Sequence, residues 1–196
     1  MNTTLIERRM LNVTELRSLG SGHTIQGYAA TFGSLSQDLG GFREIIRAGA
    51  FHETLKSANV AALWNHDPNF VLGRNVSKTL QLSEDRTGLL ATIFPPSANW
   101  AKDLMESIDR GDVSGMSFGF RVRPNGDRWL RNGKDGLPQR ELLAVDLYDV
   151  SVVLVPAYPG TSVSVKRSLP LLPSVRPMPS LDIRRRRLHL TELVAC

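Results

Sequence analysis

Residues 140–155, RELLAVDLYDVSVVLV, predict one long β-strand or two consecutive strands. Successive side chains of a strand point to opposite faces of a sheet, so the odd and even positions should separate. One face would then carry Val145, Leu147, Asp149, Ser151 and Val153. Asp149 needs a partner on that face, because burial of an unpaired carboxylate among apolar neighbours is costly.

Two kinds of partner are open to Asp149. It could orient the histidine of a Ser–His–Asp triad, for which His66 is the candidate. It could instead form a structural ion pair with Arg121 or Arg123. Asp146 has the same choice on the opposite face of the strand.

The candidate base lies in Trp64-Asn65-His66-Asp67, which follows a strand of buried type predicted for residues 60–64. At the end of a strand, His66 could point into a cleft and act as a general base. The alternative is a solvated turn histidine beside an aspartate. The other three histidines are weaker candidates, because they fall in a polar turn, on a predicted helix surface and in the C-terminal tail: His23, His52 and His189.

The candidate nucleophile, Ser117, lies in the sequence GMSFGF within a strand predicted for residues 113–122. Gly115 and Gly119 would allow close approach of a substrate or an oxyanion; the alternative is a small residue packed in a barrel interior. The Gly-x-Ser-x-Gly spacing is that of a nucleophile elbow, but an elbow needs a strand–turn–helix context that this segment lacks. Ser114 is the rival nucleophile and would face the opposite side of an extended strand.

The rest of the folded chain predicts many strands and two or three helices. Further strands are expected at residues 24–32, 72–76, 80–83 and 89–94. Helices are expected at residues 50–57 and from a cap at Ser97 or Asn99 to Arg110. Strands and helices do not alternate as in βαβ units. The sequence therefore predicts an α+β fold, mainly β, in which helices flank an antiparallel β-barrel.

The chain of 196 residues is long enough for one domain with a core and for a tail. We divide it into an N-terminal lead-in (1–19), a folded domain (20–165) and a Pro/Arg-rich tail (166–196) that is expected to be disordered. Hydrophobic residues make up 41% of the chain and charged residues 22%, as in ordinary soluble domains. Neither a membrane span of about 20 apolar residues nor a signal peptide is recognisable.

The formal net charge of +5 comes entirely from the tail. Residues 1–165 contain 17 basic and 17 acidic residues, so the folded part is not expected to bind nucleic acid. The single cysteine, Cys196, excludes a disulfide within one chain and predicts a protein of a reducing cytoplasm. No His/Cys/Asp/Glu cluster has metal-ligand spacing and no phosphate-binding glycine loop is present, so no metal or other cofactor is expected.

Taken together, these motifs resemble the prohead maturation protease family of tailed bacteriophages over roughly residues 20–165. The matching segments are GYAATF (27–32), RAGAF (47–51), WNHD (64–67), LGR (72–74), GMSFGF (115–120), LYDVS (147–151) and VPAY (155–158). The family in turn looks distantly related to assemblin, the capsid maturation protease of herpesviruses. Residues 147–150 (LYDV) resemble the assemblin segment with the third catalytic residue, with aspartate in place of histidine.

The resemblance implies a serine endopeptidase in which Ser117 is the nucleophile, His66 the base and Asp149 the orienting acid. Residues 156–161 (PAYPGT) stand where the herpesvirus pattern has an arginine pair that assists the oxyanion. Backbone amides near Ser117, or the guanidinium of Arg121 or Arg123, are then the candidate oxyanion donors.

The resemblance also implies what the enzyme acts on. Its substrates would be the major capsid protein with its scaffolding segment, other internal prohead proteins and the protease itself, by autoproteolysis. The enzyme would work in the host cytoplasm inside the assembling prohead, without a membrane partner, and a homo-oligomer is left open. The arginine-rich tail would direct the enzyme into the prohead, be removed by self-cleavage, or be a solvated extension.

Two other classes of protein remain as alternatives. One is a catalytically inactive capsid-assembly or scaffolding factor that kept the fold. The other is a nucleic-acid-binding protein that works through the four arginines at 184–187. Nucleic-acid binding by such a protein would weaken steeply with increasing salt and would require residues 168–196.

Overall fold

The computed structural model describes residues 6–12, 16–19, 24–131 and 136–154 of the chain. Two helices occur in this part, α1 (His52–Ser57) and α2 (Asn99–Asp109), and the remaining regular structure is β-strand. The prediction of a mainly β protein is therefore confirmed. The tail of residues 166–196 lies outside the described residues, as do His23, His189 and Cys196.

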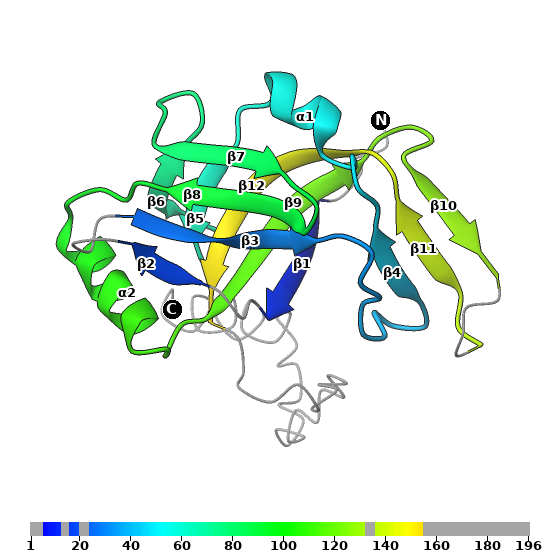
Figure 1. Cartoon of the computed structure of the whole chain (residues 1–196), viewed down its shortest axis with the longest axis horizontal. Helices are drawn as coiled ribbons and strands as arrows, with labels where there is room; N and C mark the ends of the chain where they lie inside the picture. Colours follow the sequence, from blue (N-terminus) through cyan, green and yellow to red (C-terminus); the bar gives the residue numbers. More distant parts are fainter. Residues whose placement is uncertain (1–5, 13–15, 20–23, 132–135, 155–196) are drawn as a thin grey trace, which may run out of the picture. The chain divides into compact units, whose positions relative to one another are not determined.

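The described strands form three sheets (Figure 1). The five-stranded sheet has the order β1 (Glu7–Asn12), β9 (Gly115–Val122), β12 (Val145–Val153), β5 (Ala61–Trp64) and β6 (Asp67–Arg74). The four-stranded sheet has the order β2 (Arg17–Leu19), β3 (Thr24–Thr31), β8 (Gly88–Ile93) and β7 (Leu80–Glu84). The three-stranded sheet has the order β10 (Asp127–Leu130), β11 (Gln139–Leu142) and β4 (Arg43–Ile46).

The expected closed antiparallel barrel is wrong for this structure. Within the described residues none of the three sheets closes on itself; the five-stranded sheet ends at β1 and β6. Two strand pairs are parallel, β12 with β5 and β11 with β4. The five- and four-stranded sheets instead meet through their side chains, because each has one apolar face that must be buried.

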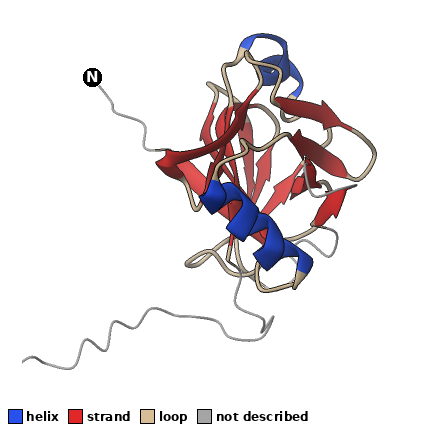
Figure 2. Ribbon diagram, turned by 90° about the vertical axis from the view of Figure 1, so that its left-hand side faces the viewer, coloured by secondary structure: helices blue, strands red, loops and turns tan. Residues whose placement is uncertain are grey.

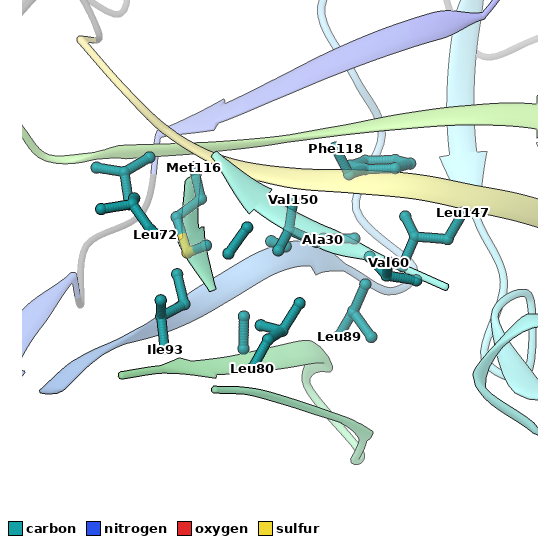
Figure 3. Packing of buried hydrophobic residues seen from close by; sticks show 14 of the residues in the cluster. Ala30, Val60, Leu72, Leu80, Leu89, Ile93, Met116, Phe118, Leu147 and Val150 are labelled. Atoms are coloured by element: carbon teal, nitrogen blue, oxygen red, sulfur yellow. The ribbon is translucent and has the colours of Figure 1, made fainter. Parts of the chain in front are cut away.

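The hydrophobic core lies between these two sheets. Figure 3 shows Met116, Phe118 and Val150 of the five-stranded sheet above Leu80 and Ile93 of the four-stranded sheet. All five are almost completely buried. The alternate positions of β9 and β12 point away from this core, so the opposite face of the same two strands is available for other side chains.

Helix α2 matches the helix expected at residues 97–110, but its cap differs. It lies across one end of the strand layers (Figure 2) and buries its apolar stripe: Ala101, Leu104, Met105 and Ile108. The residue before the helix is Ala98, and no side chain caps the first turn. The expectation of a cap at Ser97 or Asn99 is therefore wrong.

Residues 42–56, which have nearly helical apolar spacing, are divided between two elements. Residues Arg43–Ile46 form β4, and only His52–Ser57 form a helix. The strand is stabilised by parallel pairing with β11 and by a buried ion pair in which Glu44 accepts hydrogen bonds from Arg9 and Arg140. Long-range pairing has overridden the local spacing here.

The N-terminal segment assigned as a lead-in contributes two strands, β1 and β2. Strand β1 pairs antiparallel with β9 over six positions, with Met10 opposite Ser117. The domain boundary at residue 19 stays a prediction.

A β-bulge in β12 determines which of its side chains face the core. Leu147 pairs with Phe120 of β9, but the next paired residue, Asp149, pairs with Gly119, so Tyr148 is an extra residue. The alternation of faces therefore inverts at this point. The expectation that Leu147 and Asp149 share a face is wrong: Leu147 belongs to the core cluster with Val150, whereas Asp149 lies on the opposite face.

Candidate active site

His66 lies in a tight turn that joins β5 to β6. Only Asn65 and His66 separate the paired residues Trp64 and Asp67, so the connection is a two-residue hairpin loop. Both loop residues have positive φ, 51° for Asn65 and 59° for His66, as a type I′ turn requires. A histidine in the left-handed region is uncommon, and such strain is often found at functional sites. The turn directs the imidazole over the face of the sheet opposite the core.

The three predicted site residues meet on this face of the five-stranded sheet. The His66 Nε2 atom lies 2.7 Å from Ser117 Oγ in β9. The His66 Nδ1 atom lies 2.6 Å from Asp149 Oδ1 in β12. The side chains thus form one hydrogen-bonded chain from hydroxyl to imidazole to carboxylate, which is the connectivity of a catalytic triad.

Gly119 provides the space that the carboxylate occupies. It is the residue of β9 directly opposite Asp149, and a Cβ atom at this position would overlap Asp149 Oδ2. The sequence interpretation, in which Gly119 admits a substrate or an oxyanion, stays a prediction. The missing side chain serves the carboxylate of the neighbouring strand.

The site is shielded from water. Ser117 is fully buried, and the side chains of His66 and Asp149 are each only 11% exposed. Burial lowers the local dielectric constant and strengthens each hydrogen bond of the chain. It also makes every partner necessary, since an unpaired polar group would be costly here.

Asp146 and Asp149 have different partners in the structure. Arg123 Nε donates to Asp146 Oδ1 at 2.6 Å, so this pair is structural. Because of the bulge, Asp146 lies on the same face as Asp149, and the expectation that it lies on the opposite face is wrong. The guanidinium of Arg121 lies over the ring of Tyr148, 5.2 Å from its centroid. Asp149 is therefore left to His66. The candidate oxyanion donors stay a prediction.

The rival residues lie apart from this constellation. Ser114 is exposed and precedes β9, and the hydroxyl within reach of His66 Nε2 is that of Ser117. His52 is exposed at the start of α1, as expected, with Glu53 as its neighbour.

A fourth polar side chain, Ser151, joins the site and was not predicted. Its hydroxyl donates to Asp149 Oδ1 at 2.8 Å, and its Oγ lies 3.1 Å from His66 Nδ1. Ser151 is fully buried and lies opposite Ser117 across β9 and β12. The available signal was its spacing of two residues from Asp149, which places both side chains on one strand face.

The described residues hold no group of three or more His, Cys, Asp or Glu side chains arranged to bind a metal ion. In the same part of the chain, neither helix is long and apolar enough to cross a membrane.

A buried Ser–His–Asp chain on a mainly β scaffold is the arrangement of a serine peptidase. Comparison with protein families agrees: the model of the caudovirus prohead serine protease family matches residues 11–171. The chain belongs to this family and is a serine-type peptidase. The resemblance inferred from the sequence motifs is thereby confirmed.

Two known proteins are similar to this chain to different degrees. The prohead protease of Enterobacteria phage HK97 is 27% identical over 177 residues, which cover 88% of this chain and 73% of that protein. The structure of the capsid assembly protease of bacteriophage T4 is similar with a TM-score of 0.48 and 11% identity. That match covers 78% of this chain and 97% of the T4 chain.

Proposed function

We propose that this chain is an endopeptidase of prohead maturation, with Ser117 as nucleophile, His66 as general base and Asp149 as orienting acid. The observation that carries the proposal is the continuous hydrogen-bonded chain from Ser117 Oγ through both nitrogens of His66 to Asp149 Oδ1. An arrangement with only a structural role would not need the nucleophilic hydroxyl at the second nitrogen of the ring.

The proposed reaction is acyl transfer to Ser117 followed by hydrolysis. His66 Nε2 takes the proton of Ser117 as Oγ attacks the carbonyl carbon of the scissile peptide. The imidazolium, stabilised by Asp149, then gives this proton to the leaving nitrogen as the C–N bond breaks. Water repeats the sequence on the acyl-enzyme: His66 takes one proton of water as the water oxygen attacks the ester carbonyl, and it returns this proton to Ser117 Oγ as the ester C–O bond breaks and the carboxylic acid leaves.

The proposed substrates are capsid and scaffold proteins of the phage. The name of the HK97 relative places that protein at the prohead, and the family description does the same for the group. We extend this to the major capsid protein with its scaffolding segment and to self-cleavage of the protease. The place of action would be the assembling prohead in the host cytoplasm, and residues 20–165 would form the protease domain.

The test is co-expression with the major capsid protein of the same phage, followed by intact mass spectrometry. Wild-type enzyme should trim the capsid protein, and Ser117→Ala should abolish the trimming. Ser114→Ala is the matched control, because this nearby serine is exposed and outside the site, and it should leave trimming intact. Trimming by Ser117→Ala would refute the assignment of the nucleophile. Normal capsid assembly without any trimming by wild type would favour an inactive assembly factor.

A further inference from the structure

We propose that Ser151 is a positioning residue, whose hydroxyl holds the Asp149 carboxylate in the orientation that His66 needs. The inference rests on the proposed function of the site and adds a fourth member to it. Ser151 has no contact with the reacting hydroxyl of Ser117 in the described hydrogen bonds, so its effect would pass through Asp149 and His66.

The hydrogen-bond geometry assigns a direction to each contact. A serine hydroxyl has one hydrogen, and that of Ser151 is donated to Asp149 Oδ1 at 2.8 Å. The lone pairs of the same oxygen then face His66 Nδ1 at 3.1 Å. A hydrogen on Nδ1 meets two acceptors, the Asp149 carboxylate and Ser151 Oγ. This arrangement favours the tautomer with Nδ1 protonated and leaves Nε2 free to accept the proton of Ser117.

The carboxylate needs such a restraint because rotation about the terminal bond of an aspartate is soft. Of its two oxygens, only Oδ1 makes a side-chain hydrogen bond among the described residues; Oδ2 lies against Gly119. Without the Ser151 donor, a single contact with the imidazole would define the rotation. Two donors on one oxygen, from His66 and Ser151, fix it.

The backbone of the sheet holds this contact in place. The bulge at Tyr148 turns Asp149 and Ser151 together toward the His66 face. Pairing on both sides then holds Ser151 between Ser117 of β9 and Leu63 of β5. Because Ser151 is fully buried, water cannot readily replace its hydroxyl after substitution.

The first test measures His66 directly, without any substrate. In the full-length protein, nitrogen and proton NMR of the imidazole, assigned with a His66→Gln variant, reports the proton on Nδ1 and its exchange with water. We expect Ser151→Ala to accelerate this exchange about tenfold or more, and Ser151→Thr, which keeps the hydroxyl, to restore slow exchange. Unchanged exchange in folded Ser151→Ala would overturn the proposal, whether or not the protein proves to be a protease.

The second test separates positioning from mere stability. Thr54→Val is the matched control, since Thr54 is also buried and its hydroxyl accepts a hydrogen bond from the backbone of Leu147 in the same strand. For cleavage of the capsid protein, we expect Ser151→Ala to lower kcat by about 10- to 100-fold with little change in KM. Thr54→Val should lower thermal stability but leave kcat and the Nδ1 proton unchanged. An equal loss of kcat in both variants would assign the effect to the strand and refute the role of Ser151.

Discussion

The two faces of strands β9 and β12 bury side chains of different kinds. On one face, Met116, Phe118 and Val150 are completely buried in an apolar core. On the other, Ser117 and Asp149 are also buried but make hydrogen bonds to His66. The degree of burial alone therefore does not distinguish the two faces. One strand can therefore supply stability through one set of alternate residues and chemistry through the other.

The largest effect on the hydrogen-bonded face is expected from Asp149→Asn, which changes the charge but hardly the volume. The amide cannot orient the imidazole as the carboxylate does, so we expect the cleavage rate to fall about 10,000-fold. The fold should persist, because the carbonyl oxygen of the substituted amide can still accept the hydrogen bond of Ser151. Cleavage kinetics together with thermal unfolding check both statements; a rate within tenfold of wild type would contradict the role of Asp149.

The second largest effect is expected on the opposite face. Phe118 is fully buried and packs against the rings of Phe51 and Phe120, with centroids 5.5 and 5.0 Å away. Phe118→Ala should reduce the free energy of unfolding by about 3–5 kcal/mol through lost contacts and a cavity. Urea unfolding measures this loss, with the adjacent Ser117→Ala as control. The control leaves His66 Nε2 without its partner, so it should reduce stability by about 1–3 kcal/mol, less than Phe118→Ala, while abolishing cleavage.

The candidate residues of the site could be singled out from the sequence because each stands out locally, and their roles were implied by the resemblance to the prohead protease family. A histidine, a serine and an aspartate interrupt apolar stretches of the sequence, and polar groups in such places need partners. Helix α2 could be predicted for a related reason, since its apolar spacing, a local property, coincides with its buried face.

The features that could not be predicted depend on contacts between distant segments. The bulge at Tyr148 exists only in the register of β12 against β9, and without it Ser151 has no apparent role. Strand β4 depends on pairing with residues almost a hundred positions away. The position of β1 likewise depends on Arg9, which reaches Glu44 in β4. Local propensity contains none of this information.

Gly119→Ala changes β9 where it contacts Asp149, and its effect on kcat is expected to be of intermediate size. The new Cβ would displace the Asp149 carboxylate, and misplacement by about 1 Å is expected to lower kcat about 10- to 100-fold. The matched control is Gly27→Ala, whose Cβ would instead meet the flexible end of Met116 on the core side. The control should lose stability but keep its kcat. Similar kcat values for the two variants would argue against a role of Gly119 in seating the carboxylate.

The smallest effect is expected from a change in the three-stranded sheet. The buried polar side chains of this sheet are charged and lie away from the site. Glu141 is 1% exposed. Hydrogen bonds from Arg47, which has the larger effect, and from Arg128 lower the pKa of its carboxyl group. A carboxyl whose pKa is lower in the folded than in the unfolded state stabilises the protein above the unfolded pKa, about 4.3 for glutamate. This contribution is lost as the pH falls from about 5 through the lowered pKa.

Glu141→Gln removes that titration and weakens both contacts, so stability at pH 7 should fall by about 1–3 kcal/mol. Urea unfolding between pH 3 and 7 should show a shallower acid decline for the variant than for wild type, and the two curves should converge at low pH. At pH 7, kcat of the folded variant should stay within about twofold of wild type, because no contact joins Glu141 to His66, Ser117 or Asp149 in the described hydrogen bonds. Parallel stability curves would show that Glu141 does not titrate with a lowered pKa. A large loss of kcat would show that the three-stranded sheet is coupled to the catalytic face, and that chemistry is not confined to one side of β9 and β12.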